Sequence, residues 1–161
     1  MIRAHILDLA MQVLRAQLSD VPRIAALVGR YWEFENLSGF DQHRVEKHIA
    51  SLLALPEHGA CWIAERSGVV AGYIIAVYVF SLEHGGVMAE IDEFFVSPEF
   101  RSAGTGKTLL LRCEDDMRSM GIGEVQLQIG VTNIHARNFY ERHGYALRSG
   151  YALLEKPLSP A

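Results

Sequence analysis

The chain has 161 residues, of which 50% are hydrophobic and 21% charged, and its formal net charge is −4. This composition excludes an intrinsically disordered chain, and the length suits one domain. The acidic balance argues against a nucleic-acid partner, because duplex-binding proteins usually carry a basic surplus. The longest apolar run, residues 69–80, is shorter than the roughly 20 residues of a spanning helix. Two cysteines cannot form a disulfide framework and suit a reducing cytoplasm.

Short tails are expected at both ends of the chain. Residues 1–11 lack the small-residue cleavage site of a signal peptide, and Met11 offers an alternative start. No repeat or flexible linker interrupts the rest of the sequence. We therefore expect a single domain over residues 12–157, tails at 1–11 and 158–161, and a cytoplasmic protein without a membrane partner.

The first half of the chain predicts a strand, two helices and then a group of strands. Alternating apolar and polar residues predict the first strand over 12–18, and Ser19 is placed to cap the first helix. Apolar residues at helical spacing predict a second helix over Asp41–Leu55. Three strands follow at Cys61–Arg66, Val69–Phe80 and Val87–Val96. The turns between them are short, so we expect an antiparallel meander.

The second half returns to a helix, a strand, a helix and two last strands. We expect these elements at Gly104–Met120, Val125–Ile129, Ile134–His143, Tyr145–Arg148 and Tyr151–Leu154. The whole order predicts an α/β or α+β fold, in which helices pack on a mixed sheet. The apolar last strands form an expected sheet edge, and pairing of two copies would cover it, so we expect a homodimer.

A glycine-rich loop, RSAGTGKT, spans Arg101–Thr108. Its second half resembles the end of a nucleotide-binding P-loop, but that motif needs glycine where Arg101 stands. The strand over Val125–Ile129 also lacks the terminal aspartate that would hold magnesium in a nucleotide hydrolase. The sequence therefore argues against a P-loop enzyme.

The same loop still suits an anion. It joins a strand to a helix, where unpaired backbone N–H groups and the helix dipole favour negative charge. Gly104 and Gly106 remove side chains that would keep a phosphate away, and Arg101 and Lys107 add positive charge. A pyrophosphate would fit here without a metal; the alternative is an ordinary strand-to-helix turn.

Two sequence blocks resemble the GNAT N-acetyltransferase family. Residues 91–110, IDEFFVSPEFRSAGTGKTLL, resemble the family's acetyl-CoA loop, with Ser102 standing where glycine is common. Residues 133–145, NIHARNFYERHGY, match a second family motif in the expected order. This resemblance implies a mostly antiparallel central sheet flanked by about four helices, and acetyl-CoA as the acetyl donor.

The resemblance also implies which residues hold the coenzyme. They are Phe94, Phe95, Val96, Arg101, Ser102, Ala103, Gly104, Thr105, Gly106, Lys107, Asn133, Ala136 and Tyr140. A backbone N–H in the strand over residues 94–96 would face the thioester carbonyl, and a bulge or splay would free it. The pantetheine arm would lie along the same strand edge.

Four side chains are candidates for proton transfer. The resemblance makes Tyr140 the acid that protonates the leaving thiolate; the alternative is a core aromatic. Glu90, Asp92 and Glu93 are candidate bases on a strand that we expect to be central. Alternation places Glu90 and Asp92 on one face and Glu93 on the other. Glu90 matches the base of the family's histone-modifying branch, and the Asp92–Glu93 pair matches the diamine branch.

The acceptor pocket is expected near the end of the first helix. The segment YWEFE at residues 31–35 weakly resembles the diamine branch, and Glu33 and Glu35, with Asp92 and Glu93, would attract a cation. We expect direct acetyl transfer to a small-molecule amine such as a polyamine, a diamine or an amino-acid-like compound, without a metal. The alternatives are a protein or peptide acetyltransferase and a non-catalytic sensor of coenzyme A.

Overall fold

The computed structural model describes residues 10–158. Its elements, with 3₁₀ helices labelled η, are β1 (Gln12–Arg15), η1 (Leu18–Asp20), α2 (Val21–Phe34), α3 (Gln42–Leu53), β2 (Gly59–Arg66), β3 (Val69–Ser81), β4 (Gly86–Val96), η2 (Pro98–Phe100), α4 (Thr105–Ser119), β5 (Val125–Leu127) and α5 (Ile134–Glu141). The chain divides into two compact units, one ending at Gln128 and the other starting at Ile129. Within the described range, no helix is both long and apolar enough to cross a bilayer.

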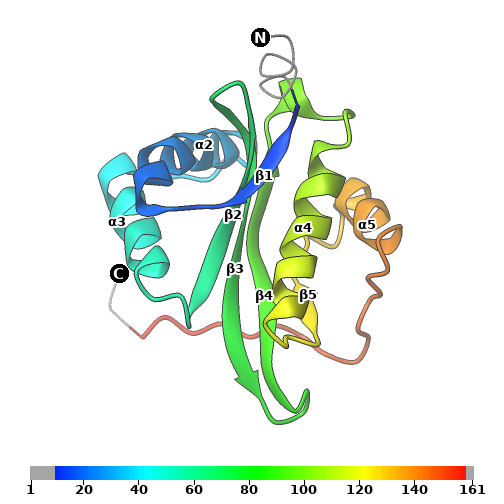
Figure 1. The fold of residues 1–161 in the computed structure, drawn as a ribbon. Helices are drawn as coiled ribbons and strands as arrows, with labels where there is room; N and C mark the ends of the chain where they lie inside the picture. The colour runs from blue at the N-terminus through cyan, green and yellow to red at the C-terminus, as the bar shows by residue number, and fades with distance from the viewer. Residues whose placement is uncertain (1–9, 159–161) are drawn as a thin grey trace. The chain divides into compact units, whose positions relative to one another are not determined.

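The five strands form one mixed sheet in the first unit, in the order β1-β2-β3-β4-β5 (Figure 1). The first three pairs are antiparallel and β4 pairs with β5 in parallel, which confirms the predicted meander and mixed fold class. Ser67 and Gly68 turn the chain between β2 and β3, both with positive φ. The strand at the centre is β3, so the prediction that β4 is central was wrong by one position.

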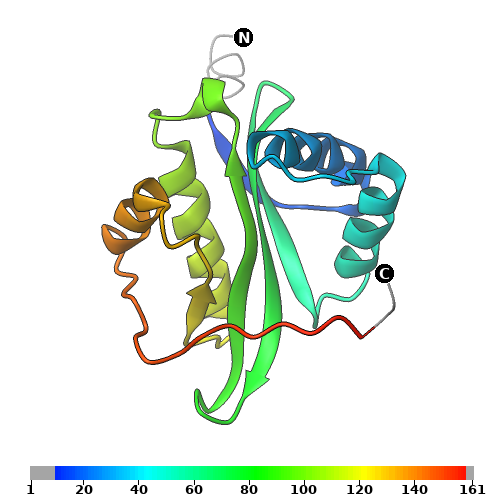
Figure 2. The same ribbon diagram turned by 180° about the vertical axis from the view of Figure 1, so that it is seen from behind.

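Helices cover both faces of this sheet. Helices α2 and α3 pack together on one face and α4 lies on the other, as the two opposite views show (Figures 1 and 2). Apolar side chains of α2 and α3 meet the sheet in a buried core, which includes Ile24, Val28, Ile49, Ile63, Tyr73 and Phe95. On the other face the indole N–H of Trp62 in β2 donates to Asp116 of α4 at 2.8 Å.

Two predicted boundaries near the N-terminus were wrong. Strand β1 ends at Arg15 rather than residue 18, because the chain turns into η1 there. Ser19 lies inside η1, and Asp20 holds the N-cap position of α2; its carboxylate accepts from the Gln17 backbone N–H at 2.8 Å and pairs with Arg23. The second helix begins where predicted, with Asp41 accepting from the Arg44 N–H at 2.7 Å, and ends two residues early at Leu53.

The second unit contains α5 and an extended tail. Asn133 caps α5 by accepting from the Ala136 N–H at 3.0 Å, and the helix ends at Glu141, before the predicted His143. Residues 145–158 contain no strand, so the two strands predicted at 145–148 and 151–154 were wrong. Strand propensity mostly reports how well side chains pack on a neighbouring strand, and no strand in the described part of the chain pairs with this segment.

Candidate active site

The loop that follows β4 reaches α4 through two left-handed backbone positions. Ser102 has φ +64° and Gly104 has φ +80°, and Gly104 occupies the N-cap position without a side-chain cap. The first helical bond at this end runs from the Thr108 N–H to the Gly104 carbonyl at 3.0 Å. The N–H groups of Thr105, Gly106 and Lys107 therefore precede the helical hydrogen-bond ladder, in the way that favours an anion.

The backbone of Gly104 is open on the side where a Cβ would lie. A Cβ built on Gly104 would meet no atom within 4 Å, so glycine is not required here to avoid a clash inside the protein. Its left-handed φ is one reason for glycine, and approach of a ligand to the bare backbone is a second. The exposed side chain of Lys107 adds positive charge in the first turn of α4. This loop is where the sequence predicted the coenzyme phosphates.

Arg101 ties the loop to α2 and β4. Its Nε donates to the Val96 carbonyl at 2.8 Å, and its guanidinium lies 4.6 Å from the ring centroid of Phe34 and 5.5 Å from that of Phe95. A second arginine, Arg30 of α2, makes two bonds of 2.9 Å to the Glu99 carboxylate. The first helix and the loop are thus joined by cation–π contacts and an ion pair.

Strand β4 carries a bulge at Asp92. Ile75 of β3 pairs with Glu93, and the next residue, Ala76, pairs with Ile91, which leaves Asp92 as the extra residue. Cross-strand partners lie on the same face of a sheet, and so do residues two apart on one strand. Glu93 pairs with Ile75 and Glu90 pairs with Val77, two residues further along β3. Glu90 and Glu93 therefore share one face. The prediction that Glu93 faces away from Glu90 and Asp92 was wrong, because the bulge shifts the alternation by one residue.

Strands β4 and β5 separate just beside this bulge. Strand β5 pairs only with Ala89, Glu90 and Ile91, and it ends at Leu127. Among residues 10–128, no strand covers that edge of β4 from Asp92 to Val96. The three residues Phe94, Phe95 and Val96, predicted to meet the thioester, lie on this uncovered edge.

The three carboxylates of β4 have different surroundings. Glu90 accepts hydrogen bonds from the side chains of Gln126, at 2.9 Å, and Gln128, at 3.1 Å. Glu93 accepts from the Tyr73 hydroxyl at 2.8 Å and from the Trp32 side chain. Burial raises the pKa of Glu93 and Asp92, helped at Glu93 by the charge of Asp92 and at Asp92 by that of Glu90.

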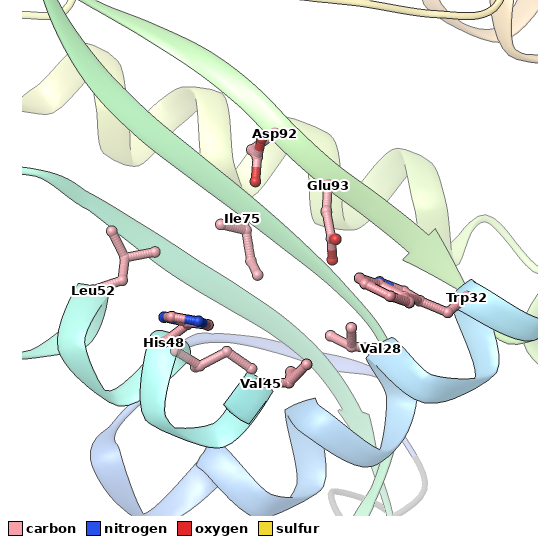
Figure 3. Close-up of a pocket in the computed structure, with 9 residues that line it drawn as sticks. Val28, Trp32, Val45, His48, Leu52, Ile75, Asp92 and Glu93 are labelled. Atoms are coloured by element: carbon pink, nitrogen blue, oxygen red, sulfur yellow. The ribbon is translucent and has the colours of Figure 1, made fainter. Parts of the chain in front are cut away.

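Asp92 and Glu93 both face a pocket between the sheet and the two helices (Figure 3). Its volume is about 190 Å³. The lining comes from α2 (Val28, Trp32), α3 (Val45, His48, Ile49, Leu52), β3 (Ile75) and β4 (Asp92, Glu93). Apart from the two carboxylates, His48 and the Trp32 indole, the walls are aliphatic.

No role in the site was predicted from the sequence for two residues of this region. His48 lines the pocket from the apolar side of α3, and Tyr73 is fully buried on β3 with its hydroxyl on Glu93. A histidine in helical register with Val45 and Leu52 was the available signal for His48. Glu33 and Glu35, predicted to attract the substrate, are exposed and lie outside the lining. No three metal-binding side chains gather within residues 10–158, and independence from a metal stays a prediction.

Tyr140 belongs to the second unit. It is 9% exposed, and its ring centroid lies 5.3 Å from those of Phe139 and Tyr145. The Tyr145 N–H also donates to the Tyr140 carbonyl at 3.1 Å. This packing fixes the ring within its own unit, and the role of the hydroxyl as an acid stays a prediction.

Known proteins share both the sequence and the fold of this chain. An uncharacterized N-acetyltransferase, YhfO of Bacillus subtilis, is 28% identical over 148 residues, which are 88% of this chain and 93% of the relative. MJ1207 of Methanocaldococcus jannaschii, also an uncharacterized N-acetyltransferase, is 30% identical over 120 residues, covering 70% of this chain and 52% of the relative.

The crystal structure of a "predicted acetyltransferase with acetyl-CoA" from Clostridium acetobutylicum superimposes with a TM-score of 0.76 at 16% identity, covering 91% of this chain and 96% of that one. A likeness at this identity shows the fold alone. The model of the acetyltransferase (GNAT) family matches residues 22–145, which include the loop before α4 and the bulged strand. The chain therefore belongs to the GNAT family and is an acetyl-CoA-dependent N-acetyltransferase.

Proposed function

We propose that this acetyltransferase transfers the acetyl group directly to the primary amine of a small molecule. The observation that carries the proposal is the bulge at Asp92, which puts Glu93 on the same face of β4 as Glu90 and brings Asp92 and Glu93 together in one pocket. Two of these carboxylates, Asp92 and Glu93, line a pocket beside the part of β4 that β5 does not cover. A cationic amine is the complementary ligand for such a site.

The coenzyme supplies an acetyl group activated as a thioester. The backbone N–H groups at the start of α4 hold its pyrophosphate, with Lys107 adding charge and Ser102 and Ala103 completing the loop. The uncovered edge of β4 offers N–H groups to the pantetheine arm and to the carbonyl oxygen. Asn133 and Ala136 start the helix that carries Tyr140.

Two side chains move the protons. Glu93 has a raised pKa, so it binds a proton more readily than an ordinary carboxylate and serves as the base that deprotonates the ammonium. The free amine nitrogen then bonds to the carbonyl carbon and the carbon–sulfur bond breaks. Tyr140 gives its hydroxyl proton to the leaving thiolate, and the proton that the new amide nitrogen loses returns to the tyrosinate through water. Asp92 attracts the cation and keeps a second carboxylate within the site.

Two other functions use the same fold. A protein or peptide acetyltransferase needs room for a polypeptide along the site, and the pocket at Asp92 and Glu93 has a volume of about 190 Å³, which suits a small molecule. A non-catalytic coenzyme A sensor has no need for Glu93 with its raised pKa or for a bulge that gathers carboxylates. The likeness to the diamine branch rests on the Asp92–Glu93 pair and, more weakly, on the segment at residues 31–35.

The test combines binding with turnover. Coenzyme A at ~100 times its dissociation constant should stabilise the fold by about 2.7 kcal/mol, and Mg-ATP should do so far less. Release of free thiol from acetyl-CoA should then require a primary amine. Stabilisation by Mg-ATP equal to that by coenzyme A, or thiol release that no small amine accelerates, contradicts the proposal.

The tail of the second unit supports a further part of the proposal, a homodimer. Leu147 is 73% exposed, Tyr151 71% and Leu154 92%, so this segment presents several apolar side chains to solvent. A second copy that packed on them would remove this area from water. Light scattering at high micromolar concentration should give twice the mass of the chain, and a monomeric mass contradicts the dimer.

A further inference from the structure

The pocket has two chemically distinct ends. Asp92 and Glu93 project into it from β4, and Trp32 lies beside Glu93 (Figure 3). The opposite wall is the apolar side of α3, formed by Val45, Ile49 and Leu52. His48 lies between Val45 and Leu52 in Figure 3. Val28 and Ile75 complete the apolar surface. All negative charge of the lining is therefore at one end.

This asymmetry discriminates among amines. An ammonium at Asp92 and Glu93 has a carboxylate on two sides. A second ammonium, carried on a chain of several methylenes, would reach the α3 wall. No carboxylate lines that wall, so a cation placed against its aliphatic side chains would lose part of its hydration without gaining an opposite charge. An alkyl or aryl group there would instead gain from leaving water.

We propose that the acceptor is a primary amine with a single positive charge and one short apolar substituent. Its ammonium lies at Asp92 and Glu93, and its apolar group lies against Val45, Ile49 and Leu52. This inference rests on the proposed function and narrows it, because it places polyamines and diamines among the poor substrates. The residues of the α3 wall then determine specificity without taking part in proton transfer.

A matched pair of substrates tests this directly. Hexylamine and 1,5-diaminopentane have the same number of heavy atoms in a row and differ in whether the far end is a methyl group or an ammonium. With the unmodified protein and saturating acetyl-CoA, we expect kcat/KM for hexylamine to exceed that for 1,5-diaminopentane at least about tenfold. Equal or better use of the diamine overturns the inference and leaves amine acetylation in place. Failure of both amines, and of every other small amine, overturns the proposed function together with the inference.

A pair of variants locates the preference on the α3 wall. Leu52→Asp places a carboxylate inside the pocket, and Ser51→Asp places the same charge one residue earlier on an exposed position outside the lining. Leu52→Asp should reduce the hexylamine preference at least about tenfold or reverse it, and Ser51→Asp should leave the ratio unchanged. An unchanged ratio in a folded Leu52→Asp variant overturns the placement of the substituent. The substrate pair in the unmodified protein needs no variant to fold.

Discussion

In the proposed mechanism, the loop before α4 and the carboxylate segment of β4 contribute to the same reaction in different ways. The loop works through backbone conformation, with φ +64° at Ser102 and φ +80° at Gly104, and offers N–H groups that any residue except proline carries. The segment from Glu90 to Glu93 works through side chains, and the backbone contributes the bulge that aims them. The loop should therefore be sensitive to conformation, and the strand to the chemistry of single atoms.

The largest expected effect on coenzyme binding comes from a substitution in the loop before α4. Gly104→Val adds a branched side chain at a left-handed position and fills the open space where the phosphates would lie. We expect coenzyme A binding to be abolished in calorimetry, while the strain itself destabilises the fold by only about 1–2 kcal/mol.

A second glycine provides the matched control for this variant. Gly85, in the turn between β3 and β4, also has a positive φ and open space around its absent side chain. Gly85→Val should lose a similar amount of stability and bind coenzyme A normally. Normal binding by Gly104→Val as well would show that the phosphates lie elsewhere.

The next effect tests the proton donor outside the first unit. Tyr140→Phe keeps the ring that packs on Phe139 and Tyr145 and removes only the hydroxyl. We expect kcat to fall ~10²–10⁴-fold with unchanged coenzyme affinity, because general acid catalysis typically contributes that much. Tyr145→Phe removes a hydroxyl from the neighbouring ring and should leave kcat unchanged. A turnover number for Tyr140→Phe within about twofold of the parent would make Tyr140 a packing residue.

Glu93→Gln changes one atom of the strand and should separate activity from stability. The amide still accepts the Tyr73 hydrogen bond but cannot take up a proton, so we expect kcat to fall about 10²-fold, with Asp92 retaining part of the base function. Asp92→Asn should act in the same direction with a smaller loss. If Glu93→Gln keeps full activity, Glu93 is not the base.

The stability of Glu93→Gln should respond to pH in a defined direction. Burial raises the pKa of Glu93 in the folded protein, so the native state holds this proton more tightly than the unfolded chain does. The parent is therefore favoured at low pH and loses stability as pH rises through the raised pKa. The variant lacks this loss. Urea unfolding should therefore show that its free energy of unfolding rises relative to that of the parent between pH 4 and pH 8. A constant difference across that range would contradict a buried ionising Glu93.

The same contrast explains what the sequence could predict. The strands β2, β3 and β4 and the helix α4 follow from local patterns, since alternation, tight-turn residues and glycines act over a few neighbours. For that reason the position of the glycine-rich loop between β4 and α4 was predicted correctly. The tail at 145–158 failed because its alternation resembles a strand, but a strand also needs a partner, which local pattern does not provide.

The carboxylates show a second limit of sequence reasoning. Simple alternation separated Glu93 from Glu90 and Asp92, because the bulge at Asp92 leaves no clear signature in the sequence. Tyr73 and His48 were missed because each lies far along the chain from the site residues near it, which are Glu93 for Tyr73 and the pocket carboxylates for His48. Residue types on one strand were predictable, whereas the face they share and their partners depend on the tertiary structure.

The smallest expected effect concerns the positioning of Glu93. The Tyr73 hydroxyl, fully buried, donates to Glu93 at 2.8 Å and so lowers a pKa that burial and Asp92 raise. Tyr73→Phe removes that hydrogen bond, and Trp32 still donates a second one. The pKa of Glu93 should therefore rise, and the active, deprotonated form should be lost at a higher pH than in the parent.

The measurement is the acid limb of kcat/KM against pH. We expect Tyr73→Phe to move this limb upward by about one pH unit, because a hydrogen bond to a charged group contributes about 1.5–3 kcal/mol and part of it is replaced by the bond from Trp32. Activity on the plateau should change little, which a general loss of structure would not allow. Tyr78→Phe removes a hydroxyl from the same strand on the opposite face of the sheet and should leave the limb in place. If the acid limb does not move in Tyr73→Phe, the group that titrates is not Glu93. Asp92 then becomes the candidate base, because it lines the same pocket and the structure shows no hydrogen bond between it and Tyr73. The variant Asp92→Asn would test it.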